Sequence, residues 1–196
     1  MKNRMKMTKL LTLTGLLLSA AFLFMGVAEI GSKATGFMLP GSDGKSHSLS
    51  DYSDKNAVVL IFLSTRCPVS NAYNERIVAL ANDYAAKGVA FIGINSNRNE
   101  KMPGIKKHAT KNGFTFPVLQ DVGNKVADSF DASVTPEVVL LDKSQTIQYH
   151  GRIDDSQKAS YVKQSDLRLA LDALLAAKVV GEAKTNAFGC SIKRVR

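Results

Sequence analysis

The 196-residue sequence has only two cysteines and three histidines, and this scarcity limits the metal chemistry that the chain can support. The histidines, His47, His108 and His150, lie far apart and form no i, i+4 pair. The cysteines, Cys67 and Cys190, are also far apart, so no CxxC motif is present. Since zinc sites use closely spaced cysteine or histidine ligands, the sequence predicts no bound metal.

A glycine-rich phosphate loop and low-complexity tracts are also missing. Without such a loop the chain carries no nucleotide signature, and we predict no organic cofactor. Hydrophobic residues make up 45% of the sequence, which is enough for one well-packed core and therefore one folded domain.

Acidic residues are absent before Glu29, and this absence concentrates part of the net charge of +9 at the N-terminus. The basic residues there are Lys2, Arg4, Lys6 and Lys9. Elsewhere, lysine and arginine are dispersed among acids and do not alternate with aromatic residues along one element. This pattern favours a solvated surface over a nucleic-acid groove, so we predict no nucleic-acid partner.

The N-terminal segment 1–28 has the pattern of a targeting sequence. Its basic start is followed by the apolar stretch Leu10 to Gly26 and by a small-residue exit that ends at Ala28. This pattern predicts a signal peptide cleaved after Ala28 and export to the periplasm or another extracytoplasmic compartment. An uncleaved single-helix anchor is the alternative, because the apolar stretch is long for a signal and short for a full membrane span. Membrane contact is expected only through this segment.

Cys67 lies where a predicted strand meets a predicted helix. It follows the apolar run Ala57 to Leu63, and Pro68 suits the first position of the helix that comes next. Unpaired N–H groups and the helix dipole at such a point favour the thiolate and lower the cysteine pKa. Cys67 is therefore a candidate redox nucleophile, although many free cysteines are simply small buried hydrophobes.

Cys190 has two possible roles in an exported chain. It could form a structural disulfide with Cys67, since oxidising compartments permit one. It could instead be the second member of a catalytic pair and resolve a species formed on Cys67.

The middle of the chain alternates strand and helix patterns. The apolar runs Ala57 to Leu63 and Val89 to Ile94 predict strands covered on both faces, and the segment between them has helical periodicity that ends at Gly88. These elements form a strand-helix-strand unit that is right-handed by default. A β-hairpin over Gly36 to Ser50 precedes it.

Six further elements, two of them paired as a hairpin, are expected before a tail without periodicity. They are a helix over Met102 to Lys111, a short strand over Phe116 to Leu119, a short helix through Val126 and Phe130, a hairpin of strands over Glu137 to Leu141 and through Ile147 and Tyr149, and a helix from Val162 to near Lys178. We therefore predict a domain over residues 29–178 and a surface tail, 179–196, that carries Cys190.

The order of these elements, with Thr135-Pro136 before the late hairpin, resembles the thioredoxin fold. More narrowly, the chain is similar to the redoxin group of alkyl hydroperoxide reductases and thiol-specific antioxidant proteins (AhpC/TSA), within its exported peroxiredoxin-like members. Three motifs carry this resemblance: Cys67 to Tyr73 (CPVSNAY), Gly151 to Asp155 (GRIDD) and Gly189 to Lys193 (GCSIK).

The resemblance implies an α/β fold with a central mixed β-sheet flanked by helices. It places Cys67 at the first cysteine of a thioredoxin CxxC motif and Ser70 at the second, which gives a monothiol CxxS version. It also places Thr135 and Pro136 in the loop where such proteins hold a cis proline, beside backbone that can pair with an extended substrate.

The peroxiredoxin signature is only half present. Ser64 to Cys67 matches its tail, but Leu60 replaces its proline, and Glu137 stands near where such proteins often carry an arginine. Arg66 or Arg152 would have to supply the arginine that polarises a peroxide.

Three functions follow, and we favour thiol-disulfide exchange. In that reaction the Cys67 thiolate, which can accept a hydrogen bond from the Ser70 hydroxyl, attacks a disulfide. Cys190 or an external thiol then resolves the mixed disulfide. Hydroperoxide reduction at Cys67 is the alternative enzyme activity. The third hypothesis is a non-catalytic module that binds a protein partner beside Pro136. Expected partners are protein or small-molecule thiols and disulfides, or hydroperoxides.

Overall fold

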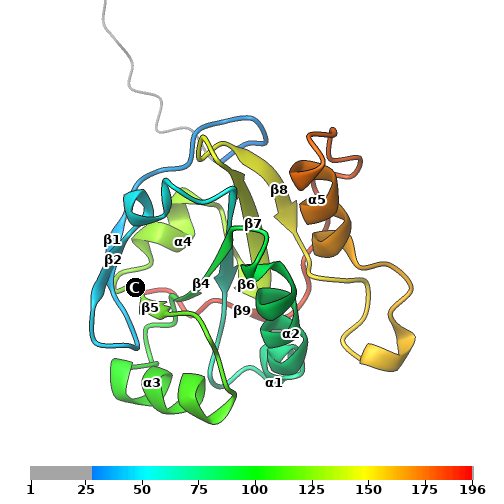
Figure 1. The fold of residues 1–196 in the computed structure, drawn as a ribbon. Helices are drawn as coiled ribbons and strands as arrows, with labels where there is room; N and C mark the ends of the chain where they lie inside the picture. Colours follow the sequence, from blue (N-terminus) through cyan, green and yellow to red (C-terminus); the bar gives the residue numbers. More distant parts are fainter. Residues whose placement is uncertain (1–27, 196) are drawn as a thin grey trace, which may run out of the picture.

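The central sheet is built on β3 (Ala57–Phe62), the apolar run that the sequence predicts as a buried strand. A computed structural model describes residues 28–195 (Figure 1). All six residues of β3 are buried, as expected when helices cover both faces of a sheet. β3 pairs in parallel with β4 (Val89–Asn95) and antiparallel with β7 (Glu137–Asp142). The mixed sheet implied by the resemblance is therefore confirmed.

Two further strands complete a sheet of order β5-β4-β3-β7-β8. β5 (Val118–Gln120) extends β4 in parallel, and β8 (Ile147–Gly151) forms the predicted antiparallel hairpin with β7. Because β3 and β4 run in the same direction, the loops that follow them lie at the same edge of the sheet. This edge carries the candidate site.

Helices lie on both faces of the sheet because successive β3 residues point to opposite sides and are apolar on both. Val59 and Ile61 pack in a core with the helices of the first face, while Val58 and Leu60 pack in a core on the second face. The first face is covered by α2 (Asn74–Ala85), α3 (Met102–Lys111) and α5 (Asp166–Leu175), and the second by α4 (Lys125–Ser129) together with a 3₁₀ turn at Leu49–Tyr52 (Figure 1).

Element boundaries differ from expectation at two helices. The helix after Cys67 is divided into a short α1 (Pro68–Asn71) and α2, with Tyr73 between them. The last helix begins at Asp166 instead of Val162, because a 3₁₀ turn at Ala159–Tyr161 and an extended Val162 precede it. The helix over residues 102–111 is confirmed.

The expected N-terminal hairpin is present as β1 (Met38–Pro40) paired antiparallel with β2 (Ser46–Ser48). It is attached to the sheet where the Ser42 N–H donates to the Val118 carbonyl oxygen at 2.9 Å. The predicted signal peptide or anchor lies, apart from Ala28, outside the described residues. Within residues 28–195, no helix is long and apolar enough to cross a membrane.

The C-terminal tail is not merely laid on the surface. β9 (Cys190–Ser191) pairs antiparallel with β6 (Val134–Thr135), and Ile192 is buried in the core of the second face. Figure 1 shows this last segment, in red, passing β6 on its way to the C-terminus. A short two-stranded sheet therefore joins the tail to the loop in front of β7.

Candidate active site

Cys67 and Cys190 form a disulfide whose Cα atoms lie 5.9 Å apart. Cys67 is the N-cap of α1, at the strand-to-helix junction that the sequence predicts, and it is only 3% exposed. Cys190 arrives on β9, where its Cα stands opposite that of Thr135. The fold thus brings together two cysteines that the sequence separates by 123 positions.

The backbone of α1 supplies a hydrogen bond to the Cys67 sulfur. The Ser70 N–H donates to Cys67 Sγ at 3.3 Å, an interaction that stabilises a thiolate more than a thiol. The expectation for the Ser70 side chain is corrected: within residues 28–195 the Ser70 group that is hydrogen-bonded to the sulfur is the backbone N–H, while the Ser70 hydroxyl oxygen accepts from the Ser64 N–H at 3.2 Å. The Thr135 carbonyl oxygen lies 3.3 Å from Cys67 Sγ and can accept from the thiol after reduction.

The Thr135–Pro136 peptide bond is cis, as the resemblance implies. Pro136 lies between β6 and β7. The Thr135 backbone contacts both cysteines, since its carbonyl oxygen lies 3.3 Å from Cys67 Sγ and its Cα stands opposite that of Cys190. Thr135 and Pro136 are therefore placed beside the disulfide.

Glu137 holds this loop in place from the first position of β7. Its Oε2 accepts from the Ser133 N–H at 2.7 Å and the Val134 N–H at 3.1 Å, and its Oε1 lies 2.8 Å from His150 Nε2. Burial by itself raises the pKa of Glu137, but the hydrogen bonds from His150 and the two backbone N–H groups outweigh burial and hold the pKa below its usual value of 4.5.

A second buried carboxylate, which no predicted motif includes, holds the loop in front of Cys67. Glu100 is 5% exposed, and its Oε1 accepts from the Ser64 hydroxyl at 2.6 Å. Its Oε2 accepts from the Thr65 N–H and hydroxyl, each at 2.6 Å, and from the Asn95 amide at 2.8 Å. Ser64 Oγ in turn accepts from the Cys67 N–H at 3.0 Å. Glu100 therefore fixes the Cys67 backbone through one intervening hydroxyl.

The polar run Asn95 to Glu100 (NSNRNE) is the signal in the sequence that could identify Glu100. It begins at the last residue of the buried strand β4, and functional side chains in α/β proteins gather at the carboxyl ends of parallel strands. Burial raises the pKa of Glu100, yet the hydrogen bonds from Ser64, Thr65 and Asn95 more than reverse that effect and lower it.

The sequence of this chain is similar to that of a known protein family. The sequence model of the AhpC/TSA family matches residues 30–150, which include Cys67 and Pro136. The chain belongs to the AhpC/TSA family.

Relatives of this AhpC/TSA protein include the thiol-disulfide oxidoreductase ResA of Halalkalibacterium halodurans, which is 28% identical over 65% of this chain and 67% of its own. Among solved structures, a hypothetical protein from Sinorhizobium meliloti 1021 is 33% identical with a TM-score of 0.80, over 87% of this chain and 97% of that one. An uncharacterized conserved protein from Geobacillus kaustophilus is 35% identical with a TM-score of 0.79, over 85% and 93%.

Two arginines, Arg152 and Arg66, are the candidates for polarising a peroxide, and the first pairs with an acid of α5 while the second is exposed. Arg152 Nε donates to Asp166 Oδ2 at 2.7 Å, so its guanidinium is engaged at the start of α5. Arg66 is exposed. Neither Arg66 nor Arg152 is hydrogen-bonded to the Cys67 sulfur, so neither arginine supports peroxide reduction as the alternative activity.

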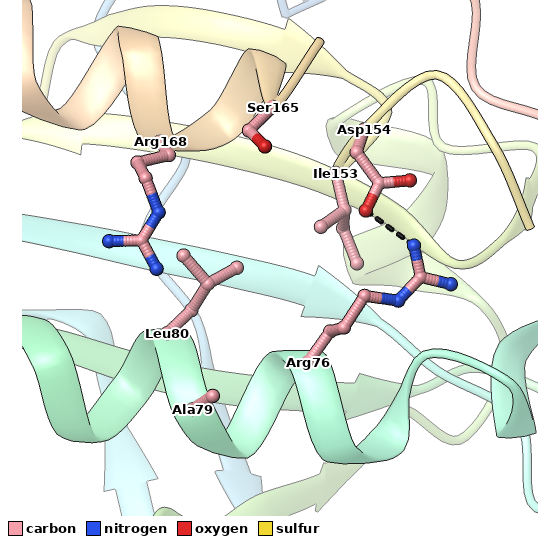
Figure 2. Close-up of a pocket in the computed structure, with 7 residues that line it drawn as sticks. All are labelled: Arg76, Ala79, Leu80, Ile153, Asp154, Ser165 and Arg168. Carbon is pink, nitrogen blue, oxygen red and sulfur yellow. Dashed lines mark hydrogen bonds and ion pairs between the residues drawn. The ribbon is translucent and has the colours of Figure 1, made fainter. Parts of the chain in front are cut away.

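Asp154 of the GRIDD motif makes structural contacts. Asp154 Oδ1 accepts from the Tyr73 hydroxyl at 2.9 Å, and its other oxygen pairs with Arg76 of α2. That pair, drawn in Figure 2, lines a cavity between α2 and α5. The cavity has a volume of about 130 Å³, and neither cysteine lines it. The segment therefore ties the end of β8 to α2.

The three histidines have separate partners. His47 pairs with Asp43, His108 contacts Asn71, and His150 contacts Glu137. Within residues 28–195, no group of three His, Cys, Asp or Glu side chains is arranged to hold a metal ion.

Acid will weaken the fold through Glu137. Because its folded pKa lies below 4.5, its stabilising contribution is complete above about pH 4.5 and is lost as pH falls through the folded pKa. We expect the free energy of unfolding, measured with urea from about pH 6 to about pH 3, to fall less steeply in Glu137→Gln than in the wild type. Equal slopes in the two proteins would contradict this assignment, and Glu29→Gln, the same change at an exposed position, is the matched control.

Proposed function

We propose that this protein catalyses thiol-disulfide exchange, with Cys67 as the nucleophile and Cys190 as the resolving cysteine. One observation carries the proposal: Cys67 Sγ receives the Ser70 N–H at the start of α1 while β9 holds Cys190 within bonding reach. The protein is a thiol-dependent oxidoreductase, in keeping with its relatives that are named thiol-disulfide oxidoreductases.

The reaction has two balanced steps. The Cys67 thiolate attacks one sulfur of a substrate disulfide, a Cys67–substrate bond forms, and the other sulfur leaves as a thiolate that takes a proton. The Cys190 thiolate then attacks Cys67 Sγ, forms the Cys67–Cys190 disulfide and releases the second substrate thiol. Two electrons pass from the protein dithiol to the substrate, and two equivalents of an external thiol then reduce the Cys67–Cys190 disulfide and leave as a disulfide.

Neighbouring groups have assigned roles in this proposal. The Ser70 N–H stabilises the Cys67 thiolate both before attack and as a leaving group. The Thr135 carbonyl oxygen and the Pro136 ring form the side of the site opposite α1. Glu100 positions the loop before Cys67, and Glu137 positions the loop before β7.

We extend the proposal to location and organisation. The basic start and apolar stretch within residues 1–28 support export, either with cleavage after Ala28 or with an anchor. A disulfide between Cys67 and Cys190 suits an oxidising compartment. Residues 29–178 form the redoxin domain in this proposal, and residues 179–196 form the tail that delivers Cys190.

Replacing the resolving cysteine tests the mechanism. In Cys190→Ser the first step proceeds and the second cannot, so glutathione disulfide should leave a stable mixed disulfide on Cys67. Intact mass of the reduced, treated variant will show one added glutathione, and peptide mapping will place it on Cys67. The wild type, treated in the same way, should instead lose two hydrogens and retain no adduct.

An unmodified Cys190→Ser protein would contradict the proposal, because it would show that Cys67 does not attack disulfides. Such an inert Cys67 would favour the non-catalytic binding module. Treatment with hydrogen peroxide in a parallel sample tests the alternative activity, which would leave a sulfenic acid on Cys67.

A further inference from the structure

The tail occupies the backbone edge next to the cis proline. β9 pairs with β6 so that Cys190 stands opposite Thr135 and Ser191 opposite Val134. An extended peptide that adds a strand to this edge would need the same backbone groups. The edge that the resemblance assigns to substrates is thus filled by the protein itself.

Contacts other than the disulfide hold the tail on this edge. Ile192 is 6% exposed and packs in the core of the second face with Leu119 and Phe130. Its N–H donates to the Ser133 carbonyl oxygen at 2.9 Å. Burial of this isoleucine side chain favours docking, and reduction of the disulfide leaves this contribution in place.

Buried amides continue the attachment beyond Ile192. Asn97 Oδ1 accepts from the Lys193 N–H at 2.9 Å, and Asn124 Oδ1 accepts from the Val195 N–H at 2.7 Å. The Arg98 N–H donates to the Lys193 carbonyl oxygen at 2.8 Å. Asn97 and Asn124 are themselves buried, so their side-chain oxygens are fixed hydrogen-bond acceptors for the tail backbone.

Gly189 shows how closely the tail approaches the proline loop. A Cβ atom built on Gly189 would overlap the Thr135 carbonyl oxygen, so only glycine fits at this point. No room is left for a second polypeptide backbone along Thr135 while the tail is docked.

We infer that the tail stays docked when the disulfide is reduced, closes the β6 edge, and restricts the substrates of Cys67 to low-molecular-weight disulfides. This inference rests on the proposed thiol-disulfide exchange at Cys67. A small disulfide needs only to bring one sulfur in line with Cys67 Sγ, whereas a disulfide within a polypeptide also needs backbone pairing at Thr135. The docked tail also keeps Cys190 at high effective concentration, which favours rapid resolution.

The experiment compares two disulfides and three full-length proteins. Reduced protein is mixed with glutathione disulfide or with insulin, and oxidation of Cys67 is followed by alkylation and mass spectrometry. The variant Ile192→Asp places a charge in the apolar core and releases the tail. Val179→Asp makes the same chemical change at a residue that is 91% exposed, and it serves as the control.

The wild type and Val179→Asp should react with glutathione disulfide about tenfold faster than with insulin, or more. Ile192→Asp should raise the rate of the first attack of Cys67 on insulin by about tenfold, while the rate of its first attack on glutathione disulfide changes little. Equal rates with both disulfides in the wild type would overturn the inference. If the wild type reacted with neither glutathione disulfide nor insulin, the proposed function would be overturned instead. Failure of the inference and failure of the proposed function are therefore distinguishable.

Hydrogen exchange tests the docked tail without any substitution. The amides of Ile192, Lys193 and Val195 should remain protected in the reduced wild type, because their acceptors do not depend on the disulfide. Exchange of these amides at the unprotected rate after reduction would overturn the inference, whether or not Ile192→Asp folds.

Discussion

Replacing Cys67 by serine will reduce thiol-disulfide exchange to the uncatalysed rate, a loss of about 10³-fold or more. A hydroxyl at this position cannot form the mixed disulfide, so the second step at Cys190 has no substrate. The measurement is the rate at which reduced protein converts glutathione disulfide to glutathione, with turnover supported by dithiothreitol. Residual activity near that of the wild type would show that the exchange does not pass through Cys67.

Ser70→Ala is the informative companion to Cys67→Ser. Its backbone N–H still reaches Cys67 Sγ, and only the acceptor for the Ser64 N–H is removed. We therefore expect Ser70→Ala to retain most of the activity, with a change of less than about tenfold. A loss as large as that of Cys67→Ser would restore the hydroxyl-donor role that the sequence suggests.

Local patterns explain why so much of the fold could be predicted. A six-residue apolar strand, a proline at the first helical position after Cys67, and an apolar strand after Thr135-Pro136 are short-range signals that neighbours in sequence create. The strands over residues 57–62 and 137–142, and the placement of Cys67 between strand and helix, followed from such signals.

The docking of the tail depends on contacts that no local pattern contains. Ile192 is one apolar residue among polar neighbours, so the tail shows no periodicity, and the core that buries Ile192 is built by α4 and the strands of the central sheet. Asn97 and Asn124 look like ordinary loop residues until the fold brings them to the tail backbone. The sequence therefore predicted a surface tail where the structure has a buried attachment.

Ser70 and Glu100 show the same limit within the site. The CxxS spacing indicates that Ser70 is near Cys67, but spacing cannot tell a hydroxyl donor from a backbone donor. Glu100 lies 33 positions beyond Cys67 and reaches it only because β3 and β4 are parallel neighbours that end at one sheet edge.

Replacing Glu100 by alanine will lower the free energy of unfolding by about 3 kcal/mol or more. The Thr65 N–H, the Asn95 amide and two hydroxyls all donate to this carboxylate in a buried position. Removing the acceptor leaves several buried donors unpaired, and each costs about 1–3 kcal/mol where water cannot enter. Urea unfolding at neutral pH provides the measurement, and a loss below about 1 kcal/mol would show that the network is not needed for stability.

Glu100→Gln separates the positioning role of this network from its contribution to stability. A glutamine can keep its oxygen toward Thr65 and Asn95, but its NH₂ group then faces Ser64 Oγ, which already accepts from the Cys67 N–H. Ser64 Oγ also accepts from the Arg66 N–H at 3.1 Å, so the amide would be a third donor to a hydroxyl oxygen with two lone pairs. The Cys67 backbone therefore shifts while most of the stability remains.

We expect Glu100→Gln to lower the exchange rate at least about tenfold for a stability loss near 1 kcal/mol, and Ser64→Ala to match it in rate. If Glu100→Gln lost stability but exchanged disulfides at the wild-type rate across pH, Glu100 would support the fold without positioning Cys67.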